Sequence, residues 1–162
     1  MGGGIALYAN WLDVFTYSDD AKTVITGLTS NASNLTEIVI PKSVTTIYGT
    51  SSSDGAFRNN KILQKVTFED GSQCTSIGSF AFYDCSSLTS ITIPASVTSI
   101  GNYAFNGCSN LSTATFEDVN RWYGYSDSTF TNGIKLTLTD AAQNATYLKS
   151  TYYNYYWKKS TT

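Results

Sequence analysis

The stretch SIGSFAFYDCSSL at residues 76–88 returns almost unchanged as SIGNYAFNGCSNL at residues 99–111. The pattern continues on both sides when the chain is aligned on the leucine that opens each unit. Successive units begin 28, 25 and 23 residues apart, at Leu35, Leu63, Leu88 and Leu111. A period of roughly 20 to 50 residues is typical of solenoids, so this spacing predicts the fold before any single strand or helix is assigned.

The longer intervals come from insertions in connections. The first lies in YGTSSSDGAF, where Ile47 and Ala56 are nine positions apart, against four between Ile100 and Ala104. In the second, EDGSQC replaces the shorter IPASV of the third unit. The repeated segments themselves therefore keep a common length of about 23 residues.

Four repeated segments have the alternating, β-branched pattern of half-buried strands. We expect them to stack in parallel, about 4.8 Å apart, and to end where Pro41 and Pro94 remove a backbone N–H. A second short strand should follow in SVTTI and SVTSI. Because a single coil cannot bury its apolar side alone, the stacked coils should share one continuous core. The four segments are EIVI, KVTF, SITI and TATF, at residues 37–40, 65–68, 90–93 and 113–116.

The string LTSITIPASVTSIGNYAFNGCSNL resembles the BspA-like type of leucine-rich repeat, and the resemblance covers residues 35–117. The tail KLTLTDAAQNATYLKSTYYNYYWKK also resembles the segment that closes such arrays. The first two units depart from the pattern at Tyr48, at Asn60 and at FED in place of IP. The resemblance implies an α/β repeat solenoid, a right-handed coil of short parallel strands, of the kind found in bacterial cell-surface and secreted proteins and in some protozoan ones.

The flanks of the repeats should cover the open ends of the solenoid. We expect residues 1–34 to form an N-terminal cap with a partial leading coil, and residues 118–162 to form a C-terminal cap. Apolar residues recur at helical spacing after Asp140, which can cap a helix start, so a helix is predicted over about residues 140–158. The apolar positions are Ile5, Leu7, Trp11, Leu12 and Phe15 in the first flank and Ala141, Ala145, Leu148, Tyr152 and Tyr155 in the second.

Composition excludes several classes of partner. Only 14% of the 162 residues are charged, against roughly 25% in an average domain, and the net charge is −2 with a pI near 4.9. No basic footprint for nucleic acid is present, and no apolar run reaches the roughly 20 residues of a membrane span. The start MGGGIALYANW lacks the pattern of a signal peptide. We expect no nucleic-acid binding and no membrane insertion.

The residue types for catalysis or metal binding are scarce. The chain has no histidine, which removes the commonest general base and metal ligand, so we expect neither an enzyme nor a cofactor. Cys85 and Cys108 fall in one column of neighbouring coils. They could form a disulfide, although stacked side chains point the same way, and free buried thiols are the favoured interpretation, with Cys74 standing in for a core valine. Glu69-Asp70 and Glu117-Asp118 are interpreted as solvated turn carboxylates rather than as a calcium site.

The outward positions of the main strands are the candidate binding face. They should align in two neighbouring rows on a rigid, nearly uncharged surface that suits recognition by many weak contacts. The alternative is that threonine is simply a good strand residue. The rows are Val39, Thr67, Thr92 and Thr115, and beside them Glu37, Lys65, Ser90 and Thr113.

Two functions remain open beside protein binding. Exposed aromatic residues of the C-terminal region could stack on a glycan, with Trp122, Tyr153, Tyr156 and Trp157 as candidates. The chain could also be a structural surface spacer. The resemblance favours a non-catalytic adhesion module outside the cell, with its signal or anchor absent from this chain, since members of the family are implicated in attachment to host matrix proteins or to other cells.

Overall fold

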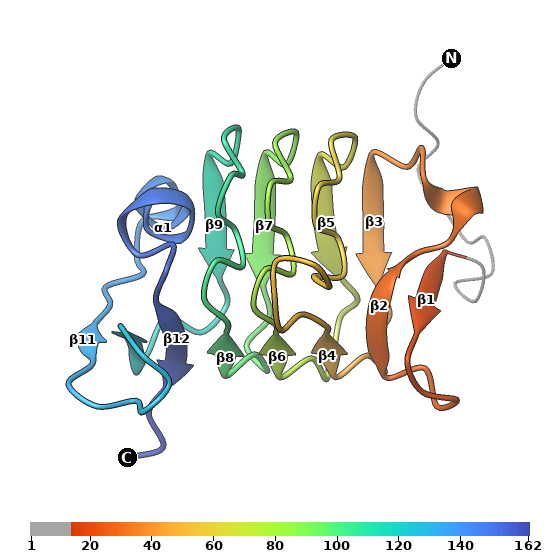
Figure 1. Ribbon diagram of the computed structural model, residues 1–162. Helices are drawn as coiled ribbons and strands as arrows, with labels where there is room; N and C mark the ends of the chain where they lie inside the picture. Colours follow the sequence, from red (N-terminus) through yellow and green to blue (C-terminus); the bar gives the residue numbers. More distant parts are fainter. Residues whose placement is uncertain (1–13) are drawn as a thin grey trace.

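The computed structural model describes residues 14–162 and confirms the stacked coils (Figure 1). Each coil contributes one strand to a four-stranded parallel sheet, in the order β3-β5-β7-β9. The inward residues are in register, as in the pairs Ile38–Val66 and Ile91–Ala114. The strands are β3 (Glu37–Ile40), β5 (Lys65–Phe68), β7 (Ser90–Ile93) and β9 (Thr113–Phe116), at the four segments predicted.

A second sheet of eight short strands forms the other long side of the solenoid, in the order β1-β2-β4-β6-β8-β12-β10-β11. Its centre, from β2 to β8, is parallel, and antiparallel strands close both ends. A 3-10 turn, η2 (Ser30–Ala32), links the leading strands to β3. The strands are β1 (Phe15–Tyr17), β2 (Val24–Leu28), β4 (Thr46–Ile47), β6 (Ser76–Ile77), β8 (Ser99–Ile100), β10 (Trp122–Tyr125), β11 (Ile134–Lys135) and β12 (Tyr156–Lys159).

The core between the sheets is built from columns of identical or similar residues. Phe57, Phe82 and Phe105 stack with successive ring centroids 5.1 Å apart, and Phe15 meets Phe57 edge-on at 6.3 Å. The AF pair of the repeat therefore places one phenylalanine of each coil on that of the next. Burial of each such side chain stabilises the fold by about 1.5–3 kcal/mol. Of the predicted N-terminal apolar residues, Ile5, Leu7, Trp11 and Leu12 lie outside the described part of the chain.

The cysteine column is free and buried, as predicted. The Cys85 thiol donates to the Phe57 carbonyl at 3.0 Å, and the Cys108 thiol donates to the Phe82 carbonyl at 3.1 Å. Each thiol thus bonds to the preceding coil instead of to the other sulfur. Asn60, which takes this position in the earlier unit, instead accepts bonds from the N–H groups of two following residues.

The C-terminal helix is shorter than predicted. Helix α1 (Ala141–Thr146), capped by Asp140, continues as a π-turn, η3 (Tyr147–Thr151), and the chain leaves helical geometry at Tyr152 with φ −122° and ψ 30°. The predicted helix over about residues 140–158 is therefore wrong beyond Thr151, where the chain turns into β12, which pairs with both β8 and β10. The reason is tertiary: β8 would otherwise be an open edge, and the aromatic residues there suit a strand.

Polar side chains of this cap bond to the last coil where no further coil follows. The buried Asn144 amide nitrogen donates to the carbonyl of Ala114 in β9 at 2.9 Å and to that of Leu138 at 3.1 Å. The Lys149 ammonium donates to the Leu111 carbonyl at 2.7 Å. Backbone groups that a next repeat would have paired are therefore satisfied by side chains.

Candidate functional site

The outward residues of the four-stranded sheet lie in two rows, as the repeat alignment predicts. Pairing places Val39 beside Thr67 and Thr92 beside Thr115, and the register of β5 with β7 brings Thr67 next to Thr92. The row is half-buried at its first three positions and exposed at Thr115. It is therefore a preformed ridge of methyl and hydroxyl groups fixed by the strand ladder.

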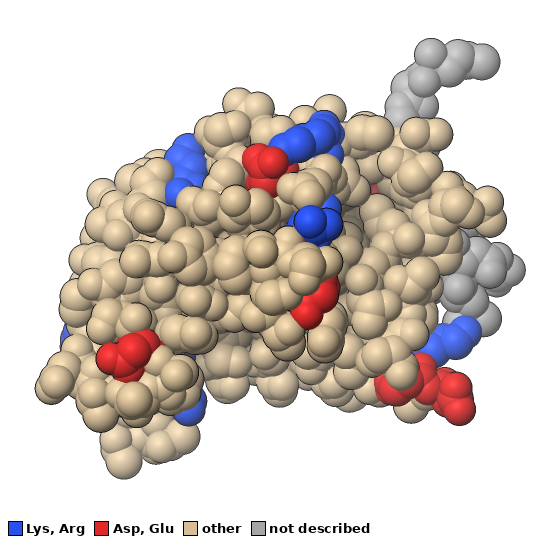
Figure 2. All heavy atoms as spheres, in the orientation of Figure 1, with Lys and Arg blue, Asp and Glu red and all other residues tan. Residues whose placement is uncertain are grey.

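The second row runs along the same strands two residues earlier. Register pairs join Glu37 with Lys65, Lys65 with Ser90, and Ser90 with Thr113. Its charges are confined to β3 and β5, so the β7 and β9 end of the face carries only hydroxyl side chains. On the face shown in Figure 2, acidic and basic residues are few and scattered.

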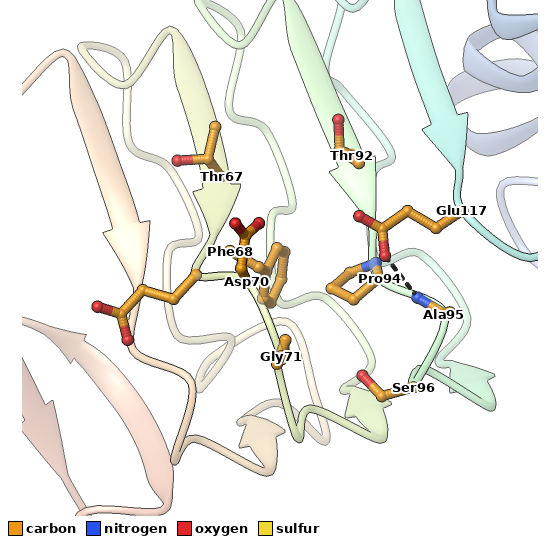
Figure 3. Close-up of a pocket in the computed structure, with 11 residues that line it drawn as sticks. Thr67, Phe68, Asp70, Gly71, Thr92, Pro94, Ala95, Ser96 and Glu117 are labelled. Atoms are coloured by element: carbon orange, nitrogen blue, oxygen red, sulfur yellow. Dashed lines mark hydrogen bonds between the residues drawn. The ribbon is translucent and has the colours of Figure 1, made fainter.

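A groove of about 470 Å³ opens where these strands end (Figure 3). Pro94, which is buried, and the half-buried ring of Phe68 give it an apolar lining. Thr67 and Thr92 line it as well, so the outward row runs directly into the groove. Its polar lining is completed by Glu69, Asp70, Ser72, Ser96 and Glu117.

Two of these carboxylates connect neighbouring coils by accepting backbone hydrogen bonds, a role that was not predicted from the sequence. Glu117 accepts a hydrogen bond of 3.0 Å from the N–H of Ala95, and Glu69 accepts one of 2.7 Å from the N–H of Lys42. In each case the donor directly follows a proline of the preceding coil. The glutamates occupy, in alternate coils, the position of those prolines, and this alternation in the aligned sequence was the available signal.

Polar side chains of the groove include groups that have no hydrogen-bond partner among the described residues. Asp70 is exposed and takes part in no hydrogen bond or ion pair there. The Ser96 hydroxyl oxygen is shielded from solvent and also lacks a hydrogen-bond partner. Within residues 14–162 no three His, Cys, Asp or Glu side chains come together as a metal site. The groove thus offers unused hydrogen-bonding capacity without a metal-ligand cluster.

The four aromatic candidates do not form one site. Trp122 and Trp157 are 1% and 2% exposed, and both pack against Phe116. The prediction that their ring faces are open to a ligand is therefore wrong, since a cap needs large apolar side chains over the last coil. Tyr153 and Tyr156 are half-buried in separate clusters, Tyr153 with Tyr103 and Tyr156 with Phe130.

The thiols are not poised for chemistry. Burial raises the pKa of the Cys74 thiol to about 11. The neighbouring Cys85 side chain, together with burial, also raises the pKa of the Cys108 thiol. Because the thiolate is the reactive form, such groups are inert at neutral pH.

Comparison with known proteins identifies the class. The family model described as "BspA type Leucine rich repeat region (6 copies)" matches residues 22–158, and the chain belongs to this family. Families of this type are typically non-catalytic repeat modules. In the described part of the chain, no helix has the length and apolar character needed to cross a bilayer.

One solved structure is also similar, that titled "The Crystal structure of Pneumococcal vaccine antigen PcpA". It matches with 27% sequence identity over 65% of this chain and a TM-score of 0.44. The match covers 23% of that chain, so the present sequence spans about a quarter of the length of PcpA. The search of curated proteins found no match.

Proposed function

We propose that this chain is a non-catalytic binding module that acts at a cell surface or outside the cell and recognises a protein through the outward face of its four-stranded sheet. The observation that carries the proposal is the continuous row Val39–Thr67–Thr92–Thr115, which leads into the groove. Membership in the BspA-type family supports it, since repeat modules of this kind present extended surfaces for interaction.

The physical properties of the face support recognition of a folded protein. Its backbone is held by parallel strand pairing on both sides of β5 and β7, so little conformational entropy is lost when a partner binds. Hydroxyl and methyl groups are inexpensive to desolvate in comparison with charged groups. A partner can therefore make many contacts with the β7 and β9 end of this face without leaving buried charges unpaired.

The test is capture of proteins from extracellular matrix and cell-surface extract by the immobilised chain. The double variant Thr67→Lys, Thr92→Lys places two long, positively charged side chains in the row and should lose the partner. A control variant, Thr137→Lys, Thr139→Lys, makes the same charge change at two exposed threonines of the C-terminal cap and should retain it. Thermal unfolding of each variant verifies that the fold is intact.

The proposal fails if a folded parent captures nothing specific, or if both double variants capture the same partner as the parent. Concentration-dependent oligomers without an external ligand would indicate a structural spacer instead. Glycan binding that depends on Tyr153 or Tyr156, the two candidate aromatic residues that are only half-buried, would indicate a carbohydrate-binding module.

A further inference from the structure

We infer that the groove at the ends of β5, β7 and β9 receives a cationic side chain, preferably arginine, from the protein partner. The inference rests on the proposed function and gives the partner a chemical feature that the threonine row alone does not specify. The row supplies a broad contact surface, and the groove beside Thr67 and Thr92 supplies one directed pocket within it.

All the described charged residues that line the groove are acidic. Glu69, Asp70 and Glu117 line it, and no lysine or arginine of residues 14–162 does so. In Figure 3 the carboxylates of Asp70 and Glu117 come from different coils and flank Pro94 and Phe68. Asp70 has no partner within the described chain, whereas one oxygen of Glu117 is held by the Ala95 N–H. That bond orients the Glu117 carboxylate and leaves its second oxygen available, so Asp70 and Glu117 both have carboxylate oxygens free to accept from a ligand.

The apolar lining fits the remainder of such a side chain. Pro94 is buried at the base, and the ring of Phe68 has no ring contact with another aromatic residue in the described chain. Long cationic side chains bury their methylene stems along apolar surface while the charged head group remains in a polar environment. A guanidinium group also stacks favourably on an aromatic face. The groove volume of about 470 Å³ falls in the range of small-ligand pockets.

An independent observation comes from Ser96. Ser96 lines the groove, and its hydroxyl oxygen is shielded from solvent and lacks a partner, which is a costly arrangement. Rotation of this side chain toward the groove would let a ligand supply the missing partner. Guanidinium carries five N–H donors in a planar fork and can bond to carboxylates and a hydroxyl together, whereas a lysine ammonium is a point charge. The acidic residues do not gather as a metal site anywhere in residues 14–162, so an organic cation is the better fit.

The test is an NMR titration of the ¹⁵N-labelled chain with the peptide acetyl-Gly-Arg-Gly-Arg-Gly-amide. A glutamine peptide of the same design and a neutral oligosaccharide, cellohexaose, serve as parallel probes. We expect chemical-shift changes centred on Gly71, Ala95 and Ser96 with the arginine peptide. Asp70→Asn should weaken its binding about threefold, and adding Glu117→Gln should weaken it further. The matched control Asp20→Asn, which removes an exposed carboxylate outside the groove, should leave the affinity unchanged.

Equal weakening by Asp70→Asn and Asp20→Asn would overturn the inference, because attraction to the net charge would then explain binding. Equal shifts with the glutamine peptide, or groove shifts with cellohexaose alone, would also overturn it, the latter in favour of a glycan. The proposed function fails separately, through absence of any captured protein. A partner captured equally by the parent and by Asp70→Asn, Glu117→Gln would leave the proposed function standing and reject the cationic anchor.

Discussion

The side-chain amide of Asn144 donates a 2.9 Å hydrogen bond to the backbone carbonyl of Ala114, so one side chain of α1 takes the place of the strand that a further coil would supply. At the other sheet, β12 pairs with β8 and continues the ladder in antiparallel direction. At the end of the array, a side chain and an antiparallel strand therefore make the hydrogen bonds that a further coil would have made. Both devices are local, and the Asn144 bond can be removed by a single substitution.

Replacement of Asn144 by alanine should lower the free energy of unfolding by about 1–3 kcal/mol, because the Ala114 and Leu138 carbonyls would lose their donor inside the cap. Urea unfolding of parent and variant measures this difference. Asn154→Ala, at an exposed asparagine of the same cap, should change stability by less than about 0.5 kcal/mol. Equal effects of the two changes would mean that Asn144 does not close the sheet.

The ion pair between Asp118 and Lys159 should make the stability of the C-terminal cap depend on pH. A hydrogen bond from the Lys159 ammonium at 2.9 Å, with a second from the Asn120 N–H, lowers the pKa of the Asp118 carboxyl from 3.8 to about 2. A carboxyl whose pKa is lower in the folded chain stabilises that state above its ordinary pKa, and the contribution disappears as the pH falls through the folded value.

The parent should therefore be more stable than Asp118→Asn at pH 7, and the gap should close between about pH 4 and pH 2. Thermal unfolding across this range measures the gap. A difference that stays constant down to pH 2 would show that the Asp118 charge is not the source of the stabilisation. Lys159 also donates to the Ala95 carbonyl, so part of its bonding remains in the variant.

The phenylalanine column should dominate stability. Phe82 is stacked at 5.1 Å on both Phe57 and Phe105, so Phe82→Ala should cost about 3–5 kcal/mol. Phe130→Ala, which truncates a ring that is 40% exposed in the β10–β11 loop, should cost far less. Chemical denaturation of both variants compares them, and a similar loss in the two would contradict a shared core along the column.

The sequence predicted the repeated part of the fold closely and the closing part poorly, for a physical reason. Strand positions such as Ile38 and Ile91 are set by a local alternation of apolar and polar residues that every coil repeats. The strands can therefore be predicted from this one sequence. The segment Tyr156–Lys159 is a strand because β8 offers it an unpaired edge, and that edge is created only by the stacked fold. Helical spacing up to Tyr155 was therefore a misleading signal.

In the candidate site, too, the regularly repeated features could be predicted from the sequence and the irregular ones could not. The outward threonine row follows from strand alternation and the 23-residue period, and the structure places it as aligned. The groove beside it depends on an inserted turn, on Phe68 in place of isoleucine and on glutamates that reach back to the preceding coil. These contacts cross coils at positions where the repeat is irregular, so periodicity carried no information about them.

All three cysteines of the chain should be unreactive while it is folded. Because Cys74, Cys85 and Cys108 are buried and burial raises the pKa of Cys74 to about 11, the native chain should not react with a thiol reagent at pH 8. All three should react after unfolding in guanidinium. Loss of two thiols on mild oxidation of the native chain would instead reveal a disulfide between Cys85 and Cys108.

The most direct test of the central claim is photo-cross-linking from defined positions of the solenoid. A benzoylphenylalanine placed at Thr92, in the outward row of the four-stranded sheet, should form a covalent adduct with a captured matrix or cell-surface protein. The same group at Thr98, exposed beside β8 in the other sheet, should form none. Adducts from Thr98 and not from Thr92 would contradict the assignment of the binding face.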